Sequence, residues 1–165
     1  MAAVTGKEAP KTMRVLGTIQ GCDILILVDS GSSHTFISDR VVRHLSGVSA
    51  MEKSVQVKVA DGNILQCYSE LKNATWSIQS CTFQSDLKVL SLSCFDMILG
   101  MDWLETYSPM KVHWREKWMT IPYLGSNVLI QGPVPTIPEG AVIEVCHVEV
   151  LLETQCVEMQ LPPEI

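Results

Sequence analysis

The sequence predicts an all-β domain: a small closed barrel with one or two short helices. Short runs rich in β-branched and aromatic residues recur from Thr12 to Tyr123, and turn signals separate them at intervals of about 8–12 residues. The run Ile24–Val28 is continuously apolar, as expected of a strand buried on both faces. Around Asp61-Gly62, the order strand, Asp-Gly, strand is a strong hairpin signal.

The expected elements follow from local patterns of apolar and turn residues. The predicted strands are Met13–Gln20, Ile24–Val28, Val55–Val59, Ile64–Tyr68, Ala74–Ile78, Thr82–Leu90, Phe95–Leu99, Val112–Trp114 and Trp118–Tyr123. A short helix is expected within Thr35–Leu45, where Ser38 or Asp39 could serve as N-cap. One or two helical turns are expected at Asp102–Tyr107.

The chain divides into three predicted parts. Residues 1–11 read as a flexible lead-in, 12–132 as the folded domain and 133–165 as a connector. Prolines 133, 135 and 138 mark the boundary, because such segments are typical of domain edges. Ala141–Leu152 is apolar enough to form a strand or a helix, alone or against further chain. The ending is typical of a fragment, so we expect a downstream domain in the full polypeptide.

Charge and cysteine usage exclude several classes of protein. The net charge of −6 argues against direct nucleic-acid binding, and no apolar run is long enough to span a bilayer. Six of the eighteen acidic residues lie after Pro133, which leaves twelve against twelve basic residues in the body. Without a signal-like stretch in Met1–Pro10, we expect a cytoplasmic or nuclear protein with reduced thiols. A zinc site at Cys146, His147 and Cys156 is a minor alternative, because the spacing fits no usual pattern.

The main candidate for chemistry is Asp29-Ser30-Gly31, at the end of the buried strand Ile24–Val28. A carboxylate there is costly to bury unless the turn satisfies it or it takes part in a reaction. In the purely structural alternative, Asp29 caps the next segment or closes an Asx-turn. The three residues alone leave both interpretations open.

Longer segments resemble a known family. Leu25–Ile37 is similar to the active-site segment of retropepsins, a class of aspartic proteases, and in particular to those of gypsy-class LTR retrotransposons of the plant type. Asp96–Leu104 resembles the second signature of that family, and Val57–Asn63 resembles its flap hairpin. The three motifs occur in the order and at the spacing of the family, and the resemblance extends over roughly 12–123.

The resemblance implies roles for individual residues. Asp29 would be the catalytic carboxylate, and Ser30, where many relatives have Thr, would tie two catalytic loops together through its hydroxyl. Gly31 would let a backbone amide approach the carboxylate. The residues Ile98, Leu99 and Gly100 would support the catalytic loop, and the flap tip would comprise Ala60, Asp61, Gly62 and Asn63.

An aspartic protease needs two carboxylates that share a proton and a water. This sequence has a single D-[ST]-G motif and about half the length of a two-lobed enzyme. The resemblance therefore implies a homodimer with both Asp29 residues at the axis, acting on a polypeptide substrate. It requires no metal and no cofactor.

Other residues have simpler explanations. His34 is expected to hydrogen-bond within the loop, and Asp102 to cap the helix that follows Gly100. Trp103, Trp114 and Trp118 are expected in the core or at its edge. A serine hydrolase is disfavoured, because no G-x-S-x-G elbow is present.

The sequence therefore predicts an aspartic endopeptidase that cuts the polyprotein of a retroelement. The alternative is a catalytically silent dimerisation or binding module of the same fold, or a degenerate genomic copy. Asp29 and Gly31 are both present, so catalysis is chemically possible.

Overall fold

The computed structural model describes residues 12–59, 62–132 and 150–151 of the chain. The lead-in 1–11 and the zinc candidates Cys146, His147 and Cys156 lie outside these ranges. The strands are β1 (Thr12–Ile19), β2 (Cys22–Asp29), β3 (Phe36–Ser38), β4 (Val48–Val59), β5 (Ile64–Ile78), β6 (Cys81–Leu90), β7 (Met97–Leu99), β8 (Lys111–His113), β9 (Trp118–Tyr123), β10 (Ser126–Gln131) and β11 (Val150–Leu151). The helices are α1 (Asp39–Val42) and α2 (Met101–Thr106).

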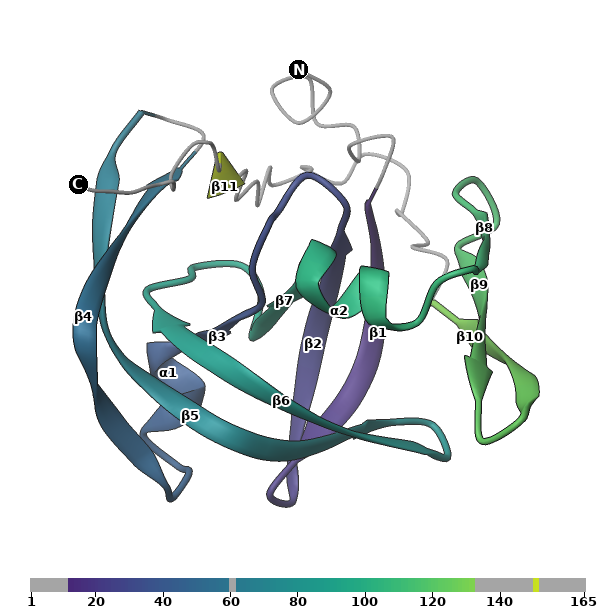
Figure 1. Ribbon diagram of the computed structural model, residues 1–165, viewed down its shortest axis with the longest axis horizontal. Helices are drawn as coiled ribbons and strands as arrows, with labels where there is room; N and C mark the ends of the chain where they lie inside the picture. Colours follow the sequence, from purple (N-terminus) through teal and green to yellow (C-terminus); the bar gives the residue numbers. More distant parts are fainter. Residues whose placement is uncertain (1–11, 60–61, 133–149, 152–165) are drawn as a thin grey trace, which may run out of the picture.

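Most of the strands belong to a single sheet that curls back on itself. Its order is β1-β2-β7-β3-β6-β5-β4-β11, and an additional pairing joins β1 to β5. That pairing, Thr18 with Ser77 and Ile19 with Trp76, closes β1, β2, β7, β3, β6 and β5 into a ring of neighbours. In Figure 1 the long strands β4, β5 and β6 curve around one side of β1 and β2. The predicted all-β class is confirmed.

The central strands are buried on both faces, as the apolar run at Ile24–Val28 predicts. Ile26 and Val28 of β2 enter one apolar cluster, whereas Leu27 enters a second. The neighbouring strand β7 divides in the same way, with Leu99 in the first cluster and Ile98 in the second. A strand between two cores needs apolar side chains at successive positions, which explains the unbroken hydrophobic runs.

The hairpin of β4 and β5 is longer than the sequence indicated. Ile64–Tyr68 and Ala74–Ile78 were predicted as separate strands, but both belong to the 15-residue β5. Of the intervening polar residues, Ser69 and Glu70 remain paired with β4, whereas Lys72 and Asn73 fall in an irregularity of the pairing with β6 between Leu71 and Ala74. The pairing of β4 with β5 also shifts between Ala50 and Val55. Local polarity at these positions reflects solvent exposure rather than a strand end.

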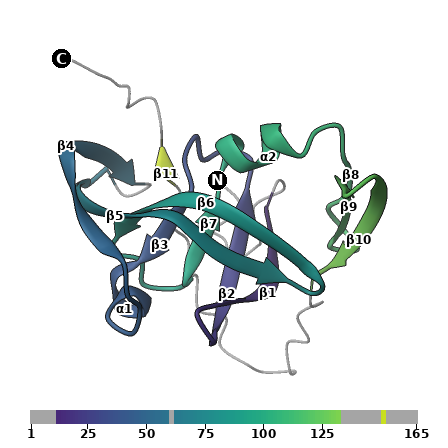
Figure 2. The ribbon, with the colours of Figure 1, turned by 60° about the horizontal axis from the view of Figure 1, so that its bottom comes forward.

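A second, three-stranded sheet has the order β10-β9-β8. The predicted hairpin of Val112–Trp114 with Trp118–Tyr123 is confirmed with a shift of one residue in its first strand. Strand β10 was not predicted; its residue Ile130 and two residues of β9, Met119 and Ile121, are fully buried in the first apolar cluster. Figures 1 and 2 show this sheet beyond β1, at the opposite end of the molecule from β4.

Each helix is short and lies next to a strand of the central group. Ser38 is the N-cap of α1, as predicted, because its side chain accepts a hydrogen bond from the Arg40 N–H. Helix α2 follows β7 directly and buries Trp103 against Trp76 and Phe83, with ring centroids 5.9 and 5.3 Å apart. Within the described residues, no helix is long and apolar enough to cross a membrane.

Candidate active site around Asp29

Asp29 is the last residue of β2, a strand that pairs with β7 and is buried on both faces. Val28 lies opposite Leu99 and Leu27 opposite Ile98 in a parallel ladder. Ile98 and Leu99 are completely buried, so they position the end of β2 and have no access to solvent. The predicted supporting residues therefore lie beside the strand that carries Asp29.

A tight turn receives the Asp29 side chain. The N–H of Gly31 donates to Asp29 Oδ1 at 2.8 Å, and the N–H of Ser32 donates to the Asp29 carbonyl at 3.1 Å. A Cβ on Gly31 would lie 3.2 Å from the same carboxylate oxygen, so glycine gives the amide the closest approach. The Asx-turn of the structural alternative is thus present. Asp29 is buried, with 8% of its surface exposed, and the turn holds its Oδ1 atom.

Thr35 links the loop after Asp29 to the segment after β7. Its buried hydroxyl donates to Asp102 Oδ1 at 2.6 Å and accepts from the Gly100 N–H at 3.1 Å. The Thr35 N–H also donates to Asp102 Oδ2 at 3.1 Å. Thr35 was not among the site residues predicted from the sequence. Its partners are more than sixty positions away, and a threonine after a loop has no distinctive local signal.

Gly100 allows the two segments to touch. A Cβ at this position would collide with the His34 carbonyl and would lie 2.7 Å from the Ser32 carbonyl oxygen. The next residue, Met101, donates its N–H to that Ser32 oxygen at 2.7 Å. Glycine is therefore required by close backbone approach, consistent with the predicted supporting role.

Asp102 has a different role from the one expected. The N-cap position of α2 is Gly100, which makes no side-chain capping bond. Asp102 lies inside the first turn, where its Oδ1 accepts from the Trp103 N–H at 2.7 Å as well as from Thr35. The N-cap prediction was wrong in position, because the carboxylate serves the loop after Asp29 and the helix together.

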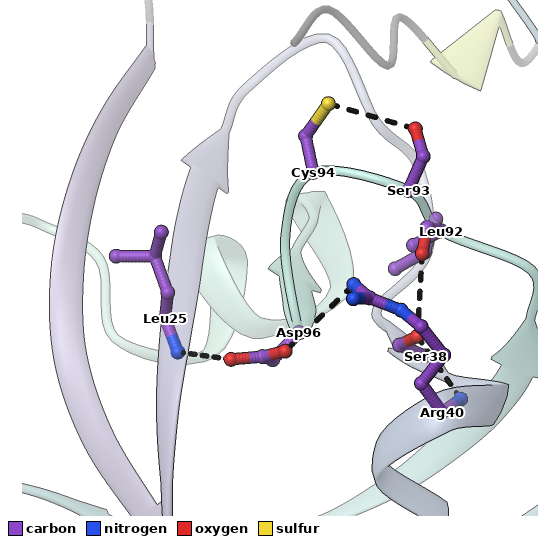
Figure 3. Close-up of polar contacts among 7 residues, drawn as sticks. All are labelled: Leu25, Ser38, Arg40, Leu92, Ser93, Cys94 and Asp96. Atoms are coloured by element: carbon purple, nitrogen blue, oxygen red, sulfur yellow. Dashed lines mark hydrogen bonds and ion pairs between the residues drawn. The ribbon is translucent and has the colours of Figure 1, made fainter.

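Asp96 anchors the other end of the strand pair (Figure 3). Its Oδ2 accepts from the Leu25 N–H at 2.8 Å, and its backbone N–H donates to the Leu25 carbonyl at 2.9 Å. The Asp96 carbonyl accepts from the Ser38 N–H at 2.8 Å. The Arg40 guanidinium lies 3.9 Å from the other carboxylate oxygen, and both side chains are partly exposed, so this ion pair contributes little to stability. Asp96 thus joins β2 to β3 just before β7 begins.

His34 takes part in the hydrogen bonding of the loop after Asp29. Its backbone carbonyl accepts from Ser32 Oγ at 2.7 Å, as the predicted role in loop hydrogen bonding requires. Burial and the positive charge of Lys88 lower the pKa of His34 below its usual 6.5, while Asp102 and a hydrogen bond with the Ser33 backbone partly offset this. The imidazole is therefore neutral at neutral pH.

Ser30 borders an apolar hollow of about 180 Å³ beside the Asp29 loop. The hollow is lined by Val28, Ser30, Met101, Leu104, Ser108, Met110, Val112, Trp114 and Met119. Its walls come from β2, α2 and the hairpin β8–β9, so one side of Ser30 faces an apolar surface. Trp103 lies in the core, and Trp114 and Trp118 are half-buried on the second sheet, as predicted.

The structure describes part of the predicted flap. Lys58 pairs with Ile64, and Val57 with Leu65, which places the tip between them. Ala60 and Asp61 lie outside the described residues. Gly62 has a φ of +91°, a conformation that favours glycine, and Asn63 is exposed. Below the tip, Val57 is buried in the second apolar cluster, so the hairpin is rooted in the core.

The described residues contain no group of three or more His, Cys, Asp or Glu side chains that could hold a metal ion. The four described cysteines, Cys22, Cys67, Cys81 and Cys94, are free thiols.

Comparison with known proteins identifies the family to which the chain belongs. The profile of the family described as retroviral aspartyl protease matches residues 2–122. The chain belongs to this family. As a family member, it carries Asp29 at the end of β2, within the matched region.

Among solved structures, the retroviral protease-like domain of Ddi1 from Leishmania major is similar, with a TM-score of 0.54 and 15% sequence identity. The alignment covers 80% of this chain and 98% of that domain. At this identity the likeness concerns the fold alone, and the expected retropepsin type is confirmed. A search of curated proteins found no match.

Proposed function

We propose that this chain is one half of an aspartic endopeptidase and supplies Asp29 to an active site shared by two copies. The observation that carries the proposal is the placement of Asp29 in a retropepsin fold. Its strand lies between two cores, and the Gly31 amide holds one carboxylate oxygen at 2.8 Å. A second copy is needed because the sequence has a single D-[ST]-G motif and the reaction uses two carboxylates.

In this mechanism the two Asp29 side chains lie at the axis of an isologous dimer. Like charges so close cannot both ionise, so the pair holds one proton. The ionised carboxylate takes a proton from water as the water oxygen attacks the scissile carbonyl carbon. The protonated carboxyl donates to the carbonyl oxygen, giving a tetrahedral diol. When the diol collapses, the C–N bond breaks, the protonated carboxyl gives its proton to the leaving amine, and the ionised carboxylate takes the proton of one diol hydroxyl. The pair again holds one proton.

The apolar hollow beside Ser30 supports the position of the second copy. Met101 and Trp114, which line this hollow next to the catalytic loop, are half-buried, so apolar surface is available there for contact with a second copy. A partner copy would cover it and bring its own Ser30 hydroxyl toward this loop. Ser30 would then tie the two catalytic loops together.

The substrate we propose is the polyprotein of a retroelement, in which the chain itself would be one segment. The support is the resemblance of Leu25–Ile37 and Asp96–Leu104 to the gypsy-class signatures of plant-type elements. Free cysteines in the described part agree with a reducing cytoplasmic or nuclear setting. This reaction uses no metal or cofactor, and we propose no nucleic-acid or membrane contact.

The first test compares wild type with Asp29→Asn on a mixed peptide library between about pH 4 and 7, where a coupled carboxylate pair can hold one shared proton. Asp23→Asn is the matched control, because Asp23 is an exposed carboxylate at the other end of the same strand. We expect pepstatin-sensitive cleavage by wild type and the control and none by Asp29→Asn. The cut sites would report the sequence preference.

A mixing experiment tests the shared site. If dimers form at random, an equal mixture of wild type and Asp29→Asn should retain about half the activity per wild-type chain, and a ninefold excess of the variant about a tenth. Constant activity per wild-type chain would overturn the shared site. Absence of cleavage by a folded wild type at all protein concentrations would instead favour a silent binding module or a degenerate copy.

A further inference from the structure

A short strand from the C-terminal connector pairs with the predicted flap. In β11, Val150 lies opposite Val59 and Leu151 opposite Lys58, in an antiparallel register. These two residues of β4 immediately precede the hairpin tip, and β4 uses its other edge to pair with β5. The connector thus occupies the outer edge of the flap strand.

Figures 1 and 2 both place β11 between the flap end of β4 and the loop that joins β2 to β3. That loop begins directly after Asp29. The strand therefore lies on the side of the flap that faces the candidate catalytic residue. An extended polypeptide held between the flap and Asp29 would need the same edge for its backbone hydrogen bonds.

We propose that Val150–Leu151 is a blocking strand, which occupies the substrate-facing edge of β4 in cis and competes with polypeptide substrates. The inference rests on the proposed protease function for the identity of the competitor. The pairing itself can be tested without any activity. In the rest of the described part of the chain, no other strand pairs with this edge of β4.

Two physical arguments favour occupancy in cis. A tethered strand meets the flap at an effective concentration in the millimolar range, so even a weak two-residue pairing can compete with dilute substrate. Val150 is also a β-branched residue that favours extended backbone, and substrates bind proteases of this kind as extended chains. Displacement of the connector would release the edge without any change in the residues around Asp29.

The test uses the full chain with Val150→Pro and Leu151→Pro combined. In an antiparallel ladder, only one of two successive residues forms both hydrogen bonds with the residue opposite it. Replacing both Val150 and Leu151 by proline therefore removes the N–H that donates to β4, whichever of the two carries it. The control places two adjacent prolines further along the same connector, Val157→Pro with Glu158→Pro. Amide hydrogen exchange at Lys58 and Val59 reports the pairing, and KM and kcat for a peptide substrate report the competition.

Successive N–H groups of β4 point to opposite edges, so only one of Lys58 and Val59 donates to β11. We expect exchange at that amide to accelerate severalfold in the Val150/Leu151 variant and to stay at the wild-type rate in the control. We also expect KM to fall severalfold with kcat unchanged, because the variant frees the edge and leaves the catalytic groups intact. Equal exchange in all three proteins would overturn the pairing. Altered exchange with an unchanged KM would overturn the blocking role. Absence of cleavage by wild type, variant and control alike would refute the protease function, and the exchange result would still decide the pairing.

Discussion

Replacing Thr35 by valine tests whether its hydroxyl holds the Asp29 loop against the segment after β7. Valine has nearly the same shape but offers neither a donor nor an acceptor. The buried Gly100 N–H would lose the acceptor that now lies 3.1 Å away, and Asp102 would lose a donor at 2.6 Å. The two losses differ in cost, because Asp102 is exposed and water can replace its donor, whereas the buried amide has no such access.

The expected magnitude follows from these two losses. A buried amide left without its acceptor costs about 1–3 kcal/mol, and an ordinary hydrogen bond that water can replace about 0.5–1.5 kcal/mol. Thr35→Val should therefore lower the free energy of unfolding by about 2–4 kcal/mol. Thr35→Ser keeps the hydroxyl and loses one methyl group, so it should cost about 1 kcal/mol.

Urea unfolding monitored by tryptophan fluorescence gives both values, and thermal melts should place Thr35→Val roughly 10 °C below wild type for a loss of about 3 kcal/mol. The serine variant is the matched control for the loss of side-chain volume. If the valine and serine variants unfold within about 0.5 kcal/mol of each other, the hydroxyl does not fasten the loop and the reasoning fails.

Three further predictions concern other parts of the site. Asp96→Ala should lower the free energy of unfolding in urea by about 1–3 kcal/mol, because the Leu25 N–H, which donates to Asp96 Oδ2 at 2.8 Å, loses its acceptor. Asp96→Asn keeps an oxygen at this place and should lower it by less than about 1 kcal/mol. Equal losses for the two variants would contradict this reasoning. The pKa of His34 lies below its usual 6.5, so the unfolded chain binds more protons and this residue makes stability fall as pH decreases below about 6.5. Lys88→Met should raise the pKa of His34 in an NMR titration, and an unchanged pKa would refute the assigned cause. Burial raises the pKa of the Cys67 thiol, so alkylation mapped by mass spectrometry should modify the half-buried Cys94 in the folded protein and Cys67 only on unfolding; similar rates would contradict the burial.

The parts of the fold that the sequence predicts are those whose causes are local. The run Ile24–Val28 indicates a strand between two cores because every position must be apolar there, and both apolar clusters meet on β2. Ser38 was recognisable as an N-cap because capping acts within a few residues. The same holds for the turn at Asp29-Ser30-Gly31, which satisfies its own carboxylate.

The parts that the sequence did not predict depend on distant partners. Asp102 was expected to cap α2, but its carboxylate is shared with Thr35, which lies 67 positions earlier in the chain. The long β5 was divided into two because its middle is polar, and only the pairing with β4 and β6 shows that it continues. Strand β10 has a single fully buried residue, Ile130, so its pattern was too weak to identify it.

The closed ring of strands has a consequence for the behaviour of the protein at high concentration. Closure removes most free sheet edges and leaves the twelve-residue β4 as a long edge, on which β11 pairs with only Val59 and Lys58. Such an edge can act as a template for self-association into fibrils or mixed oligomers. The register shift between Ala50 and Val55, with the exposed charges of Glu52 and Lys53 inside it, interrupts that template. The irregularity in the hairpin therefore protects solubility, and straightening it with apolar residues would make the protein prone to aggregate.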